Sequence, residues 1–194
     1  MHVTLRVAPH VYGLRSHRCF RAVRSAFVGG CNRFGMRLVH YSVQGNHLHL
    51  ICEASDERAL GRAMQGLGVR LARALNRVMG RKGQVFPDRF HSRALRTPLA
   101  VRRVLAYVLN NARRHGLLRA SGVDVYSSAG AFDGWNTPLD ESTRWALVRL
   151  RLAVSREQPV RRAVVRPKSW LLRVGWRAHG LIDPSETPGP RPAP

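Results

Sequence analysis

Hydrophobic residues recur at strand and helix spacings in a definite order over the first 116 residues. Val3, Leu5 and Val7 alternate with polar residues, as in a half-buried strand. Residues 16–28 instead repeat at helical spacing and stop at a pair of glycines. The pattern predicts, in order, a strand over 2–7, a helix over 16–28, strands over 36–43 and 47–52, a helix from 56 to 79, a short extended stretch that ends near 95, and a helix from 98 to 116.

This order contains two strand–helix–strand crossovers, which predict a ferredoxin-like split βαβ unit with an antiparallel sheet. Residues 44–46 (QGN) form a tight turn, so the strands before and after this turn lie side by side. Within the strand over 36–43, we expect Met36, Leu38 and His40 on one side. The predicted fold class is therefore α+β.

The composition changes after this unit. Residues 120–143 contain no basic residue and are rich in Gly, Ser, Asp and Pro, which predicts a connecting segment at the surface. Residues 144–182 are basic again, and residues 183–194 are rich in Pro. We therefore expect a domain over 1–119, a connecting segment over 120–143, a basic C-terminal extension over 144–182 and a flexible tail over 183–194.

The charge is strongly unbalanced, with 33 Lys and Arg against 11 Asp and Glu and a net charge of +22. Such a charge opposes compaction unless an anionic partner neutralises it, and nucleic acid rewards it directly through counterion release. Only Lys82 and Lys168 are lysines, and the excess of arginine can equally reflect codon usage in a GC-rich genome. The chain contains no apolar run near 18 residues, no signal peptide and no CxxC pair, so we expect a cytoplasmic protein without a membrane span.

Two histidines stand two residues apart within residues 46–50 (NHLHL). Because alternate residues of a strand share a face, His47 and His49 project together while Leu48 and Leu50 enter the core. Two imidazoles at this spacing can bind one divalent cation. The alternative is a pair of solvent-facing histidines on a half-exposed strand.

A tyrosine and an asparagine are four residues apart in the last predicted helix. Tyr107 and Asn111 therefore lie on one helical face, where a phenol and a carboxamide can serve as nucleophile and metal ligand. The alternative is an amphipathic tyrosine at the rim of the core and an asparagine near a helix end.

Together, these motifs resemble those of the single-tyrosine HUH transposases, especially the REP-associated tyrosine transposases of bacteria. The resemblance covers residues 2–117 and depends on residues 45–50 (GNHLHL), 85–91 (VFPDRFH) and 107–111 (YVLNN) in that order. Related sequences often carry Asn-Pro where this chain has Asn111-Ala112.

The resemblance implies metal-dependent cleavage and rejoining of single-stranded DNA through a 5′-phosphotyrosine intermediate, in DNA transposition or repeat processing. It implies that Tyr107 is the nucleophile and that His47, His49 and Asn111 bind Mg²⁺ or Mn²⁺. The implied partners are single-stranded or hairpin DNA, in a bacterial cytoplasm at the nucleoid, and a homodimer is an option that the resemblance leaves open. The alternatives are a non-catalytic nucleic-acid-binding relative and an RNA-binding protein of the same fold.

Further basic residues are candidates for contact with DNA. Several line the long helix and its exit, where a solvated face is the alternative. His91 is a spare metal ligand or a DNA contact, with a structural or phosphate-binding role as the alternative. In the extension, we expect Trp170 and Trp176 to pack on the core while the neighbouring arginines contact phosphate. The candidate DNA-binding residues are Arg70, Arg73, Arg77, Arg81, Lys82, Arg89 and His91.

Overall fold

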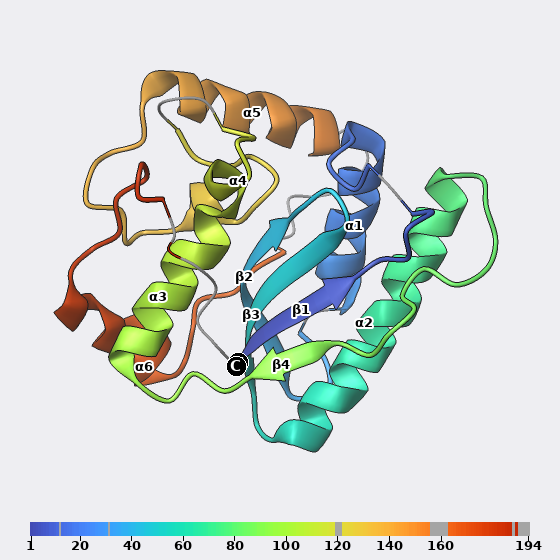
Figure 1. Cartoon of the computed structure of the whole chain (residues 1–194), viewed down its shortest axis with the longest axis horizontal. Coiled ribbons are helices and arrows are strands. Elements are labelled where there is room, and N and C mark those ends of the chain that lie inside the picture. The colour runs from blue at the N-terminus through green and yellow to red at the C-terminus, as the bar shows by residue number, and fades with distance from the viewer. Residues whose placement is uncertain (12, 31, 119–121, 156–162, 188, 190–194) are drawn as a thin grey trace.

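The computed structural model describes residues 1–187 and 189, except for 12, 31, 119–121 and 156–162, and the side chains of 150–155. Its first half is a four-stranded antiparallel sheet with the strand order β2-β3-β1-β4 (Figure 1). The strands are β1 (His2–Arg6), β2 (Met36–Val43), β3 (His47–Ala54) and β4 (His91–Arg93), and the helices between them are α1 (His17–Gly30) and α2 (Glu57–Val78). This is the ferredoxin-like α+β arrangement that the periodicities predict.

The two helices after α1 begin at side-chain caps. Asp56 accepts a hydrogen bond from the Ala59 amide at 2.6 Å and starts α2. Thr97 accepts from the Ala100 amide at 3.2 Å, and Pro98 follows in the first turn of α3 (Pro98–Leu109). The sequence therefore determines where the helix that carries Tyr107 begins.

The sheet separates two hydrophobic cores. Val3, Leu5 and Leu50 face α1 and α2 on one side. Ile51 faces α3 on the other side, where Trp176 also packs. Figure 1 shows α3 on the opposite side of the sheet from α1 and α2. Tyr107, the functional candidate on α3, is therefore placed against the second face of the sheet.

The residues after 121 cover α3 and the edge of β2. They form α5 (Glu141–Ser155), α6 (Trp170–Arg173) and two 3₁₀ turns, Ala129–Ala131 and Gly175–His179. The connecting segment is anchored by an ion pair, in which the partly buried Arg15 contacts the buried Asp124 at 2.7 Å. The expectation for the tryptophans is right for Trp176, which is buried, and wrong for Trp170, which is 64% exposed. No described helix is long and apolar enough to cross a membrane.

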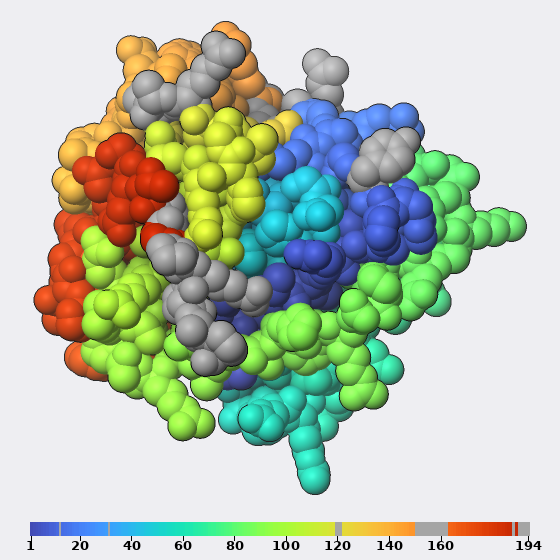
Figure 2. All heavy atoms as spheres, viewed as in Figure 1, coloured from blue at the N-terminus to red at the C-terminus, as the bar shows by residue number. Residues whose placement is uncertain are grey.

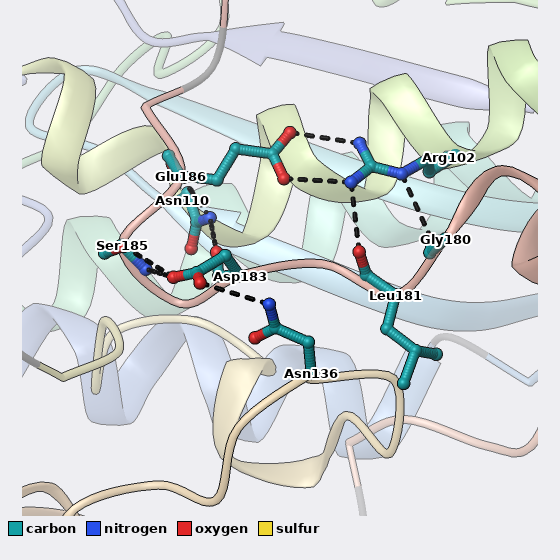
Figure 3. Close-up of polar contacts among 8 residues, drawn as sticks. All are labelled: Arg102, Asn110, Asn136, Gly180, Leu181, Asp183, Ser185 and Glu186. Atoms are coloured by element: carbon teal, nitrogen blue, oxygen red, sulfur yellow. Dashed lines mark hydrogen bonds and ion pairs between the residues drawn. The ribbon is translucent and has the colours of Figure 1, made fainter.

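The start of the expected flexible tail is held in place (Figure 3). The Glu186 carboxylate accepts two hydrogen bonds from Arg102, each 3.0 Å long. Asn110 Nδ2 donates to the backbone oxygens of Asp183 and Glu186. Residues 183–186 thus form a clamp on α3, whereas residues 188 and 190–194 of the expected tail lie outside the described residues.

A β-bulge changes the expected pattern of β2. Met36 and Leu38 face the first core as predicted, but the register with β3 shifts between Leu38 and His40. The expectation that His40 shares their side is wrong, because the extra residue turns it to the other face. There His40 Nδ1 lies 3.1 Å from Ser128 Oγ, and its ring lies 5.3 Å from that of Phe132.

Burial of His40 makes stability depend on pH. Desolvation lowers the pKa of His40 from 6.5 to about 4, although the Asp133 carboxylate opposes the shift. The unfolded chain therefore binds a proton that the folded chain excludes, so stability present above pH 6.5 is lost as the pH falls towards 4. Between pH 7 and pH 4, we expect the loss in the free energy of unfolding to be about 3 kcal/mol smaller in His40→Gln than in the wild type.

Urea unfolding at pH 7 and pH 4 measures this effect for wild type, His40→Gln and the exposed control His10→Gln. The control is expected to lose as much stability as the wild type. Equal losses in all three proteins would show that His40 is not the titrating group.

Candidate active site

The histidine pair lies on β3 beneath α3. Leu48 and Leu50 enter the first core, as predicted, and the two imidazoles project from the opposite face. His49 is only 2% exposed, because α3 covers it, whereas His47 is partly exposed near the end of the strand. The alternative of two solvent-facing histidines is therefore wrong.

The imidazoles form a chain of close contacts. Asn46 Oδ1 lies 2.8 Å from His47 Nδ1, and the Nε2 atoms of His47 and His49 are 3.0 Å apart. His49 Nδ1 lies 3.2 Å from His2 Nε2 and 3.3 Å from Thr4 Oγ1. Because Asn46 Oδ1 can only accept, it places the proton of a neutral His47 on Nδ1 and leaves Nε2, which lies 3.0 Å from His49 Nε2, as an acceptor.

Tyr107 lies directly against this pair. Its ring centroid is 5.2 Å from that of His49 and 6.0 Å from that of His2, both in edge-on geometry. The Arg114 guanidinium lies 5.8 Å from the centroid of the same ring. A phenol, three imidazoles and a cation therefore meet at one place, although they come from β1, β3, α3 and α4 (Asn111–Arg114).

A nearby thiol does not compete as a nucleophile. Cys52 follows on β3, but its side chain is buried in the first core, on the side away from Tyr107. Burial raises the pKa of Cys52 to about 12, so the thiolate is not formed near neutral pH. Of these two side chains, Tyr107 is therefore the better-placed candidate nucleophile.

The predicted helix over 98–116 is interrupted beside the site. Asn110 ends α3 with φ −101° and ψ 13°, and Asn111 begins α4. The prediction of one continuous helix is wrong here because Asn110 is held by the clamp of residues 183–186. The chain still passes along β3, since the ring centroid of His115 lies 6.3 Å from that of His47.

In the sequence, Asn111 lies between Tyr107, whose ring contacts His49, and His115, whose ring contacts His47. It is fully buried, and both Oδ1 and Nδ2 lack a hydrogen-bond partner among the described residues. Buried carboxamides are normally hydrogen-bonded, so this unpartnered one is a candidate position for a bound ligand.

The candidate DNA-binding residues do not gather at one place. Arg70, Arg73 and Arg77 are exposed on α2, across the sheet from Tyr107. The α2 exit and the segment before β4 carry the remaining cations Arg81, Lys82 and Arg89, of which Arg81 is held at 3.0 Å by Asn76 Oδ1. His91 pairs in register with Thr4, which pairs with His49, so it lies on the same face of the sheet as the site.

Sequence reasoning missed the contribution of β1. His2, Thr4 and Arg6 are the polar positions of the alternating first strand, and they pair in register with residues of β3. His2 and Thr4 contact His49 directly, and Arg6 pairs with His47. The alternation predicts one polar face but does not show that this face meets the two histidines.

Comparison with known proteins gives a structural match but no match to a family model or a curated protein. Among solved structures, the chain is similar to a REP-associated tyrosine transposase bound to a REP hairpin. The two chains are 16% identical, the match covers 61% of this chain and 68% of the other, and the TM-score is 0.49.

Proposed function

We propose that this protein is a transposase-type enzyme that cleaves and rejoins single-stranded DNA through Tyr107. The observation that carries the proposal is the placement of the Tyr107 ring against His49, whose Nε2 converges with that of His47. The buried, unpartnered carboxamide of Asn111, four residues after Tyr107, supports Asn111 as a third donor group. A nucleophile beside such a donor set suits attack on a phosphodiester.

The donor set fits a divalent cation. Among the described residues, no group of three or more His, Cys, Asp and Glu is placed to hold a metal ion. However, two imidazole nitrogens and one amide oxygen form a mixed set, which would be supplied by His47, His49 and Asn111. Such a set accepts Mg²⁺ or Mn²⁺, because imidazole suits Mn²⁺ and carbonyl oxygen suits both. When bound, the cation supplies Lewis-acid stabilisation of charge on the phosphate.

The residues of the chain perform the transfer in two steps. The Tyr107 hydroxyl loses its proton to solvent as its oxygen attacks phosphorus, the bond from phosphorus to the 3′ oxygen breaks, and that oxygen takes up a proton. The products are a 5′-phosphotyrosine and a free 3′-hydroxyl. Attack by a 3′-hydroxyl on the phosphotyrosine reverses the exchange and rejoins strands without ATP, since one phosphodiester bond replaces another.

The sheet face around Tyr107 supplies positive charge for the phosphates of a DNA strand. Arg114 lies over the Tyr107 ring, and Arg6 and Arg93 project from β1 and β4 on the same face. Figure 2 shows β1, in blue, beside the yellow-green surface of α4 and the end of α3. Together with the net charge of +22, this arrangement supports single-stranded or hairpin DNA as the substrate.

The salt dependence of binding tests which surface holds the strand. For a short single strand, we expect the triple variant Arg6→Ala, Arg93→Ala, Arg114→Ala to reduce the slope of log affinity against log salt by about 2, since each phosphate contact contributes about 0.7. The matched triple variant of Arg70, Arg73 and Arg77 on α2 should leave that slope unchanged. A reduced salt slope only in the α2 variant would place the DNA strand on the α2 side of the sheet.

The function itself is tested with labelled single-stranded hairpin DNA, Mn²⁺ and a denaturing gel. We expect a labelled band that migrates with the protein, together with a shortened strand that carries a free 3′-hydroxyl. DNA binding on a native gel without a covalent band would instead support a non-catalytic nucleic-acid-binding protein.

A further inference from the structure

A second buried carboxamide lies just after β2, the strand that pairs with the histidine strand β3, and has no role in the proposed site. Gln44 follows β2 and is only 2% exposed. Its Nε2 donates to Ser42 Oγ at 2.7 Å, but its Oε1 has no hydrogen-bond partner among the described residues. A buried carbonyl oxygen without a donor opposes folding, so its presence here calls for a partner that is bound later.

The strand register places this oxygen on the face of the site. Ser42 pairs directly with His49, and residues opposite each other in an antiparallel sheet project to the same side. Gln44 is two residues further along and therefore shares that side. The backbone amide of Gln44 donates to the backbone oxygen of His47 at 2.8 Å, so Gln44 lies opposite His47 across the turn.

Asn111 belongs to a different element, since it is the first residue of α4. α4 passes over the start of β3, as the contact between His115 and His47 shows. In Figure 2, the cyan surface where β2 turns into β3 lies directly beside α4. Two unpartnered amide oxygens, Gln44 Oε1 and Asn111 Oδ1, thus belong to segments that neighbour the two imidazoles, because β2 pairs with β3 and α4 leads to the contact of His115 with His47.

We propose that Gln44 is a fourth ligand of the divalent cation, an inference that rests on the proposed function. The donor set then consists of Nε2 of His47 and His49 with Oε1 of Gln44 and Oδ1 of Asn111. The hydrogen bond from Nε2 to Ser42 orients the carboxamide and leaves Oε1 for the cation. Because all four ligands are neutral, the full charge of the cation remains available to the phosphate.

Mn²⁺ binding to the full chain, measured by titration calorimetry without DNA, tests the proposal. We expect Gln44→Met, which keeps the size of the side chain and removes the oxygen, to weaken Mn²⁺ binding about 10- to 100-fold. Gln44→Glu replaces the amide oxygen by a carboxylate and should strengthen binding. Gln65→Met, at an exposed position on α2, is the matched control and should bind as the wild type does.

The outcomes separate this inference from the proposed function. Loss of binding in His49→Ala with unchanged binding in Gln44→Met overturns the role of Gln44 alone. Equal and negligible binding in wild type and His49→Ala overturns the cation site and the Gln44 proposal with it. Thermal unfolding in EDTA shows whether Gln44→Met is folded, and if it is not, unchanged affinity in Gln44→Glu overturns the proposal.

Discussion

Replacing Tyr107 by phenylalanine is expected to abolish the covalent protein–DNA product. The substitution removes one oxygen and leaves the ring that packs against His49 and His2, so the fold is retained. Loss of a covalent nucleophile lowers the rate of such reactions by about 10⁴-fold or more. DNA affinity should change little, because the basic residues around the ring remain in place.

The measurement compares cleavage of labelled hairpin DNA by wild type, Tyr107→Phe and Tyr126→Phe. Tyr126 is the matched control, since its ring also packs against an aromatic side chain and an arginine, at 4.9 Å from Phe20 and 4.6 Å from Arg15. The control is expected to form the covalent product at the wild-type rate. A covalent band that persists in Tyr107→Phe would show that another residue attacks the DNA.

The order of the strands and helices could be predicted because it depends on local signals. The alternation of Val3, Leu5 and Val7 and the cap at Asp56 act within a few residues of the chain. The bulge after Leu38 could not be predicted, because it depends on how β2 pairs with β3. The same holds for the break at Asn110, which depends on contacts with residues more than 70 positions away.

The candidate site could be predicted in part for the same reason. His47 and His49 share a face by strand alternation, and Tyr107 and Asn111 follow each other at helical spacing. The contacts of His2 with His49 and Tyr107 arise only when β1 pairs with β3 and α3 packs above them. No spacing along the chain contains that information.

The sequence also does not predict on which face of the sheet a basic residue lies. The arginines of α2 and the arginines of β1 and β4 belong to one positively charged chain, yet the sheet separates them. Strand register, rather than charge density, places Arg6 beside His47 and Arg93 beside His2, on the sheet face against which Tyr107 packs. Charge therefore predicts the class of partner, and the fold predicts which basic residues share a face with Tyr107.

Removal of the histidine pair is expected to have the second large effect. The double variant His47→Ala, His49→Ala loses both nitrogen ligands, and Lewis-acid catalysis contributes several kcal/mol to phosphoryl transfer. Cleavage should therefore fall by about 10³-fold, and addition of Mn²⁺ should no longer stimulate it. Tyr107 remains present, so any residual covalent product should form at the same slow rate with and without EDTA.

The single variants should be unequal, because the two imidazoles occupy different environments. His49 is buried between His2, His47 and Tyr107, whereas His47 is partly exposed and is held at its other nitrogen by Asn46. His49→Ala thus removes a ligand and also the ring against which Tyr107 packs, so it should lower cleavage more than His47→Ala. His10→Ala, at an exposed position, is the control and should retain full Mn²⁺ stimulation. Equal activity of all these variants in Mn²⁺ would show that the histidine pair is structural and that Tyr107 reacts without a metal.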